Sequence, residues 1–375
     1  MSTDGGDVNL RVVSLLPSLT EIICAIGGGL ERKLVGVTHE CDYPAAVVAR
    51  CERVTTSDIN PHTMSQEEID RCVRGSLSMG HSLYGLDEER LKVANPSIIY
   101  LIYTLCDVCA PAYPMVLSTC ARVLGDDPRI VSIEPGSVAE VIDSVRLVGR
   151  ETGFAQEGEA EAQRLEAGFA KIRAVVTKNA QGEAAPAPAP APSGSAADIR
   201  TDGINGAQGH GVGKRKKKVA FLEWLEPLFN GGHWIPDMVR AAGGEYTMAE
   251  PGNKSVGVTP EELSAYDADI ILVAPCGMDR KRAVSDGENM WRHEWWRSLR
   301  AVREGEVYGL DGNAYYARPG PRLLQGSGII ARLLNGDTVG DEIGEEISPR
   351  DSWTAVADPR QRQGSSADDA TTLST

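Results

Sequence analysis

The sequence lacks the features that would place it in a membrane or on nucleic acid. No stretch approaches the roughly 20 consecutive apolar residues that a membrane-spanning helix needs, and the first nine residues contain no basic segment followed by an apolar run. Acidic residues outnumber basic ones by 53 to 38, a formal charge of -15, whereas binding to phosphates needs a surplus of Lys and Arg. We therefore expect a cytoplasmic protein with no nucleic-acid partner and no membrane insertion. We also expect a monomer.

The common catalytic motifs are also missing. No serine lies in a nucleophile-elbow pattern, and no P-loop occurs. Gly27 to Gly29 follow a predicted helix, whereas the glycines of a dinucleotide fingerprint lie between the first strand and its helix. The eight cysteines follow no disulfide-scaffold spacing, so we interpret them as thiols or metal ligands. Hydrolase, NTPase and dehydrogenase functions thus have no motif to support them.

What the sequence does contain is the composition of a globular α/β protein. Of its 375 residues, 42% are apolar and 24% are charged, and a chain of this length usually forms two domains. Short apolar runs alternate with helical patterns, which predicts two Rossmann-like lobes with parallel sheets. The predicted segments are a flexible N-terminus at 1–8, an α/β lobe at 9–154, a connecting helix at 155–178, a disordered insert at 179–217, a second α/β lobe at 218–335 and a disordered acidic tail at 336–375.

The connecting helix and the insert are the clearest of these segments. Leu165, Phe169, Ile172 and Val176 fall on one helical stripe, and 24 helical residues would span about 36 Å, enough to join two lobes. The insert is rich in Ala, Pro and Gly and cannot form a packed core. The basic run at 214–218 resembles a nuclear-import signal, although a solvated flank is the favoured interpretation.

Polar side chains follow the predicted strands of both lobes, where open α/β sheets bind their ligands. In the first lobe these are His39, Glu40 and Cys41 after one strand and Cys106 and Cys109 after another. In the second lobe they are Glu223, Trp224, His233 and Cys276, with Tyr315, Tyr316 and Arg318 after a later strand. We therefore expect a crevice that both lobes face with His, Cys and carboxylate groups.

A metal site in this crevice is one hypothesis. Thiolate and imidazole suit zinc or iron, and the spacing of Cys106 and Cys109 lets both sulfurs reach one ion. No second pair of this kind occurs, so a complete structural zinc site within one lobe is not predicted. Buried, unligated thiols are an equally good interpretation. The candidate metal ligands are His39, Cys41, Cys106, Cys109, His233 and Cys276.

The large side chains near the crevice also have two interpretations each. Trp224 and Trp234 could form an aromatic wall against a flat ligand, or they could pack in the core. Arg318 could pair with a ligand carboxylate or phosphate, or it could form a structural ion pair.

Several segments resemble the cobalamin and iron-siderophore receptors, which have a periplasmic-binding fold. They are Arg11 to Ile22, Leu34 to Thr38, Asn95 to Ile99 and Asp311 to Tyr316. The motifs around Cys41, Cys106, His233, Cys276 and Arg318 resemble a cysteine-rich branch described as cobalamin-binding. The resemblance implies two lobes joined by one long helix, with a cobalamin-type tetrapyrrole or another metal chelate held between them. The candidate ligand-binding residues are Pro17, Ser18, His39, Glu40, Cys41, Tyr43, Glu223, Trp224, His233, Trp234, Tyr315, Tyr316 and Arg318.

The sequence therefore leaves two functions open. The first is non-catalytic binding of a cobalamin-like corrinoid or related metal chelate in the crevice. The second is a metal- or cysteine-dependent enzyme in which Glu40 or Glu223 acts as a base. An ABC transporter partner is in doubt, because neither a signal peptide nor a lipid-anchored cysteine is visible near the start of the sequence.

Overall fold

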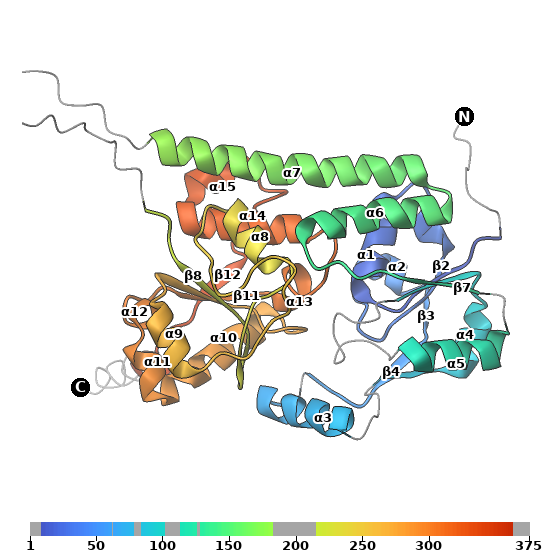
Figure 1. The fold of residues 1–375 in the computed structure, drawn as a ribbon, viewed down its shortest axis with the longest axis horizontal. Helices are drawn as coiled ribbons and strands as arrows, with labels where there is room; N and C mark the ends of the chain where they lie inside the picture. The colour runs from blue at the N-terminus through green and yellow to red at the C-terminus, as the bar shows by residue number, and fades with distance from the viewer. Residues whose placement is uncertain are drawn as a thin grey trace, which may run out of the picture.

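The computed structural model describes residues 9–61, 63–78, 84–101, 113–125, 128–182 and 215–362. It has two α/β lobes and a long helix that runs along both (Figure 1). This architecture confirms the fold predicted from the sequence. Among the described residues, none of the helices combines the length and the apolar character needed to cross a membrane.

The first lobe contains a five-stranded parallel sheet and a small two-stranded antiparallel ribbon. Its elements are β1 (Val12–Ser14), α1 (Pro17–Ile26), η1 (Leu30–Lys33), β2 (Leu34–Val37), α2 (Ala45–Val48), β3 (Glu52–Arg53), β4 (Thr55–Ser57), α3 (Gln66–Ser78), β5 (Tyr84–Leu86), α4 (Glu88–Ala94), β6 (Ile98–Leu101), α5 (Tyr113–Leu124), β7 (Arg129–Ser132) and α6 (Val138–Thr152). The sheet has the order β3-β2-β1-β6-β7, and β4 pairs with β5.

Helices cover both faces of the first sheet. Val12 of β1 packs in a cluster with α1 and α6, and its neighbour Val13 packs in another cluster with α4 and α5. Successive residues of a strand point to opposite faces, so a strand covered on both sides is apolar throughout. This burial explains the unbroken apolar runs in the sequence.

The second lobe contains a mixed five-stranded sheet. Its elements are β8 (Val219–Leu225), β9 (Leu228–Asn230), α8 (Ile235–Ala241), α9 (Pro260–Tyr266), β10 (Ile270–Val273), α10 (Arg280–Asn289), η2 (Met290–Arg292), α11 (Glu294–Ser298), α12 (Arg300–Arg303), β11 (Val307–Leu310), α13 (Gly312–Tyr315), α14 (Leu323–Asn335), α15 (Asp337–Ile343), β12 (Trp353–Ala355) and α16 (Pro359–Arg362). The order is β12-β11-β10-β8-β9, with both edge strands antiparallel.

The antiparallel edges differ from the prediction of parallel sheets in both lobes. Only Glu226 and Pro227 separate β8 from β9, and a connection of two residues can join antiparallel strands but not parallel ones. At the other edge, β12 comes from the region predicted as a disordered tail. The sheet is therefore parallel only in its central part, β8, β10 and β11.

Helix α7 (Ala155–Gly182) joins the lobes and is longer than the predicted helix at 155–178. It packs on α6 of the first lobe and on α14 and α15 of the second (Figure 1). A Cβ added to Gly149 of α6 would lie 2.9 Å from the Cα of Gly158 in α7, so the close approach of these helices needs glycine. The buried residues of α7 belong to one apolar cluster that extends into both lobes.

The ends of the chain differ from the prediction where they are described. The predicted tail at 336–375 contains α15, β12 and α16 up to residue 362. Arg332, which is 1% exposed, donates hydrogen bonds to Asp337, Asp341 and the carbonyl of Ser348. A buried guanidinium needs such partners, and they anchor the segment that the acidic composition had suggested was loose. Residues 1–8, 183–214 and 363–375 lie outside the described residues.

Candidate functional site

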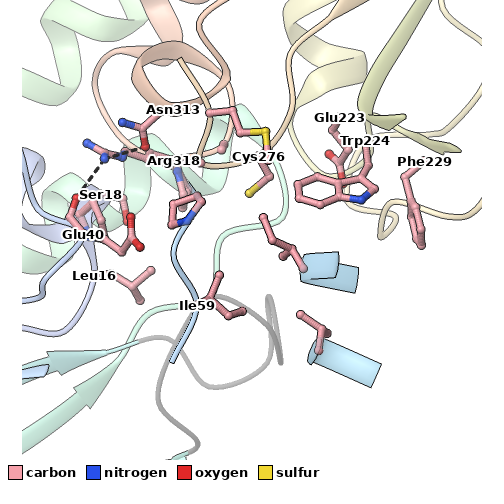
Figure 2. Close-up of a pocket in the computed structure, with 18 of the residues that line it drawn as sticks. Leu16, Ser18, Glu40, Ile59, Glu223, Trp224, Phe229, Cys276, Asn313 and Arg318 are labelled. Carbon is pink, nitrogen blue, oxygen red and sulfur yellow. Dashed lines mark hydrogen bonds between the residues drawn. The ribbon is translucent and has the colours of Figure 1, made fainter. Parts of the chain in front are cut away.

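A cavity of about 280 Å³ lies between the lobes, where the carboxyl ends of the strands meet (Figure 2). The loop after β1 and the segment after β2 form one wall, and the carboxyl end of β8, strand β9 and the segments after β10 and β11 form the other. This is the position at which open α/β sheets bind ligands. The lining residues are Leu16, Pro17, Ser18, Glu40, Ile59, Pro61, Ile69, Asp70, Val73, Glu223, Trp224, Phe229, Cys276, Gly277, Met278, Asn313, Ala317, Arg318 and Pro319.

The N-terminus of α1 contributes a polar corner to the first wall. Pro17 occupies the first turn of the helix, where its missing N–H costs nothing, and no side chain caps the helix. Ser18 is 1% exposed, and its Oγ has no hydrogen-bond partner among the described residues. A buried hydroxyl without a partner is unfavourable, so this corner is suited to a polar group of a ligand.

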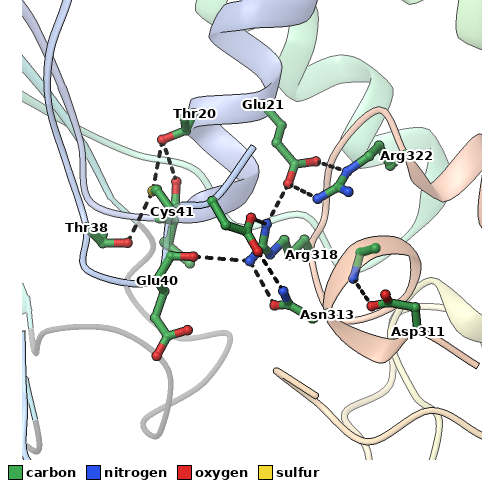
Figure 3. A network of polar contacts seen from close by, with 12 residues as sticks. Thr20, Glu21, Thr38, Glu40, Cys41, Asp311, Asn313, Arg318 and Arg322 are labelled. Carbon is green, nitrogen blue, oxygen red and sulfur yellow. Dashed lines mark hydrogen bonds and ion pairs between the residues drawn. The ribbon is translucent and has the colours of Figure 1, made fainter. Parts of the chain in front are cut away.

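Ion pairs join the lobes directly beside the cavity (Figure 3). The Glu21 carboxylate of α1 accepts hydrogen bonds from Arg318 at 2.9 Å and from Arg322 at 2.8 Å. Arg318 also donates to Asp42 at 2.5 Å and to Asn313 at 2.8 Å. Burial opposes the ionisation of Asp42, but the hydrogen bond and charge of Arg318 outweigh it and lower the pKa of that carboxyl. The Arg318 charge is thus already compensated inside the protein.

His39 and Glu40 follow β2, but only Glu40 lines the cavity. The Nδ1 atom of His39 lies 2.7 Å from the Thr55 hydroxyl, and its Nε2 atom lies 3.4 Å from the Glu40 carboxylate. The hydrogen bond from His39 lowers the pKa of Glu40, although burial acts in the opposite direction. Glu40 is therefore a carboxylate at neutral pH.

Cys41 and Tyr43 lie outside the cavity lining. The Cys41 thiol is 1% exposed and lies 3.2 Å from the hydroxyls of both Thr20 and Thr38, and burial raises its pKa. Tyr43 is exposed at the surface, where the guanidinium of Arg322 lies 4.4 Å from the centre of its ring. The Cys41 thiol therefore packs inside the protein. The ring of Tyr43 lies against Arg322, on the solvent side of its ion pair with Glu21.

The second wall is aromatic and sulfur-rich (Figure 2). The indole N–H of Trp224 donates to the carbonyl of Glu226 at 3.1 Å, and the Trp224 side chain lines the cavity with Phe229. Cys276 and Met278 follow β10 and line the same wall. Flat apolar surface with a few polar groups is typical of small-molecule sites.

His233, Trp234 and the tyrosine pair do not line the cavity. His233 has a φ of 51°, and burial lowers its pKa. The indole of Trp234 donates to the carbonyl of Tyr316 at 2.7 Å, and the Tyr316 hydroxyl donates to the carbonyl of Gly326 at 3.2 Å. Tyr315 lies beside Arg322. The position of Trp234 therefore agrees with the interpretation that this side chain packs in the core.

The predicted metal ligands are not brought together by the described structure. Cys106 and Cys109 lie outside the described residues. Of the other four candidates, Cys276 lines the cavity, whereas His39, Cys41 and His233 do not. Within the described ranges, no group of three or more His, Cys, Asp or Glu residues is arranged to hold a metal ion.

One side of the cavity is formed by residues that were not predicted from the sequence. Ile59, Pro61, Ile69, Asp70 and Val73 belong to α3 and the segment before it. The spacing of Ile69 and Val73 on an otherwise charged helix was the available signal, because it marks a narrow apolar stripe.

The carboxyl group of Glu223, which lines the cavity, changes its protonation near neutral pH. Burial raises the pKa of its carboxyl to about 7, and a hydrogen bond with Ser255 acts in the opposite direction. Between about pH 4.5 and 7 the folded protein retains a proton that the unfolded chain releases, so this contribution to stability is lost as the pH rises through 7. We expect the free energy of unfolding of Glu223→Gln to rise relative to that of the wild type by on the order of 2 kcal/mol between pH 5 and pH 8. Urea denaturation at each pH measures this difference. Glu261→Gln, at an exposed position, should show no such change; equal pH profiles for Glu223→Gln and wild type would contradict the assignment.

Comparison with known proteins supports the fold and corrects two expectations. A family model described as "periplasmic binding protein" matches residues 200–314. No curated protein sequence matches the chain. Among solved structures, the periplasmic vitamin B12-binding protein of Vibrio cholerae is 18% identical, with 88% of this chain and 97% of that chain covered and a TM-score of 0.55.

Two further structures show the same fold. The periplasmic heme-binding protein of Roseiflexus sp. RS-1 is 19% identical, with 90% of this chain and 99% of that chain covered and a TM-score of 0.55. An ABC transporter substrate-binding protein from Listeria monocytogenes is 16% identical, with 87% and 98% covered and a TM-score of 0.57.

These comparisons contradict the expectation of a cytoplasmic protein. The matching family model and the Vibrio and Roseiflexus structures are described as periplasmic. The doubt about a transporter partner also loses its support, because the Listeria protein is described as the substrate-binding protein of an ABC transporter. Both expectations had rested in part on the lack of a signal segment at the start of the sequence.

Proposed function

We propose that this protein binds a cobalamin-like corrinoid, or a related metal chelate, in the cleft between its lobes without chemical change to the ligand. The observation that carries the proposal is the interlobe cavity, with an aromatic and sulfur-containing wall on one lobe and a polar corner on the other. The similar structures from Vibrio cholerae and Roseiflexus bind vitamin B12 and heme.

The charges around the cavity favour a ligand without free carboxylates. The ionisable lining residues of the described chain are Glu40, Asp70, Arg318 and Glu223, whose pKa is raised to about 7. Arg318 is already paired with Glu21 and Asp42, so a ligand carboxylate would meet like charges. Heme carries two propionates, whereas the rim of a corrinoid carries neutral carboxamides. A carboxamide oxygen could accept a hydrogen bond from the buried Ser18 hydroxyl.

The arrangement gives less support to an enzyme. The pKa of Glu40 is lowered, so its carboxylate is a weak base at neutral pH. The pKa of Glu223, raised to about 7, would suit a base. Binding of cargo, with delivery to an ABC importer as for the Listeria protein, accounts for the cavity without a catalytic group.

The test is a calorimetric titration of purified, reduced protein with hydroxocobalamin and, separately, with hemin, while visible spectra are recorded. We expect saturable binding of hydroxocobalamin at a 1:1 ratio, and at least tenfold weaker binding of hemin because of its two carboxylates. Copurified metal is measured on the same sample. Absence of hydroxocobalamin binding, together with stoichiometric zinc or iron, would overturn the proposal in favour of a metalloenzyme.

A further inference from the structure

Helix α3 belongs to the first lobe in sequence but is docked on the second. Gln66, at its start, is 3% exposed and makes hydrogen bonds with both of its amide atoms. Its Nε2 atom donates to Asp286 of α10 at 2.7 Å, and its Oε1 atom accepts from the backbone N–H of Leu225 at 2.7 Å. One side chain of the first lobe therefore satisfies a strand and a helix of the second lobe.

Arg282 of α10 holds the segment that precedes α3. It donates to the carbonyls of Pro61 and Met64, each at 2.9 Å. Its Nε atom donates to the same Asp286 that accepts from Gln66, at 2.8 Å. Asp286 thus connects Gln66 and Arg282, and these three side chains, which we call the α3 latch, fasten the segment to the second lobe.

The underside of α3 is apolar and faces the cavity. Ile69 and Val73 are buried against Met278, and Ile59, Met64 and Trp224 pack around them in a cluster separate from the main cores. The opposite face of α3 carries Glu67, Glu68, Arg71 and Arg74. Figure 1 shows α3 apart from the sheet of its own lobe and below the second lobe. The helix therefore closes one side of the cavity as a separate unit.

The size of the cavity conflicts with the proposed ligand as long as α3 stays docked. A volume of about 280 Å³ lies just below the range of roughly 300 to 1,000 Å³ for ligand pockets. A corrinoid with its carboxamide rim is a large ligand, and outward movement of the wall that contains Ile69 and Val73 would enlarge the cavity. In the chain, α3 follows β4, which pairs with β5 and is not a strand of the five-stranded sheet, so movement of α3 need not disturb that sheet.

We propose that α3 is a movable wall of the cleft, that the α3 latch holds it closed in the free protein, and that its release admits the ligand. The proposal rests on the proposed function for the identity of the ligand. The latch itself consists of contacts made without any ligand. Gln66 is the positioning residue, because it is buried and bridges β8 and α10.

The experiment compares Gln66→Ala and Arg282→Ala with wild type. Arg71→Ala is the matched control, because Arg71 lies on the same helix and pairs with exposed Glu67. Hydrogen exchange of the α3 amides is measured in the ligand-free full chain, and the association rate of hydroxocobalamin by stopped flow. We expect α3 exchange to be at least tenfold faster and association severalfold faster in both latch variants, with Arg71→Ala unchanged.

Two results would overturn the proposal. Unchanged α3 exchange in both latch variants would show that these side chains do not hold the helix. Faster exchange with an unchanged association rate would show that α3 does not control entry. Exchange at the wild-type rate of the β10 amides, and of the β8 amides other than that of Leu225, which loses its acceptor in Gln66→Ala, shows that the variants are folded. If hydroxocobalamin does not bind to wild type, the proposed function fails separately, and hemin then serves as the probe for the rate measurement.

Discussion

Replacement of Glu21 by Ala is expected to lower the free energy of unfolding by about 3 to 5 kcal/mol, because it leaves two arginines without their buried partner. Glu21 is 3% exposed and accepts hydrogen bonds from Arg318 and Arg322 of the other lobe. Asp42 remains beside Arg318, but it lies at the surface side of the group. The measurement is urea denaturation followed by circular dichroism.

The control for Glu21 is Glu88→Ala. Glu88 pairs with Arg122 on the surface of the first lobe, and exposed pairs of this kind contribute little to stability. A loss for Glu21→Ala no larger than that for Glu88→Ala would show that the ion pairs between the lobes do not stabilise the fold. Glu21→Gln keeps the shape of the side chain and part of its hydrogen bonding. Its loss of unfolding free energy should therefore lie between the losses of Glu21→Ala and Glu88→Ala.

Replacement of Trp224 by Ala is expected to weaken hydroxocobalamin binding about 30-fold, since truncating a central aromatic side chain costs about 2 kcal/mol. The Trp224 side chain lines the cavity with Phe229 (Figure 2). Trp224→Phe should keep most of the affinity, because it retains a flat ring. Calorimetry measures each dissociation constant.

Trp295→Phe serves as the second control for this prediction. Trp295 packs against Trp296 in an apolar cluster of the second lobe and does not line the cavity. Its substitution should leave the affinity unchanged. If Trp224→Ala binds hydroxocobalamin as tightly as wild type, the aromatic wall is not a ligand contact.

The cavity could be predicted only in part, for a reason that lies in strand geometry. Of the residues predicted to bind a ligand, Pro17, Ser18, Glu40, Glu223, Trp224 and Arg318 line it, because residues at or shortly after the carboxyl ends of parallel strands gather at one edge of the sheet. The position in the chain does not give the direction of a side chain once the strand has ended, since the regular alternation stops there.

Cys41 and Trp234 illustrate that limit. Both follow strands of the predicted crevice, yet the Cys41 thiol contacts Thr20 and Thr38, and the Trp234 indole donates to Tyr316. Those contacts come from the packing of α1 and of the segment after β11. The predicted convergence of thiols and imidazoles failed for this reason in the described part of the chain.

The two lobes and the long α7 helix follow from the local pattern of the sequence. Short apolar runs that alternate with helical patterns predict parallel strands covered by helices, and the stripe at Leu165, Phe169 and Ile172 predicts a helix packed along one face. Such patterns depend on neighbouring residues, whose spacing is set by the geometry of the backbone.

The partners of these elements depended on the assembled lobes. Glu21 and Arg318 are separated by 297 positions, and Gln66 and Asp286 by 220. An apolar stripe shows that the face of α3 is covered, but not by which lobe, because periodicity contains no information about distant partners. The closed wall of the cleft and the ion pairs beside it are contacts between the two lobes, which α7 joins.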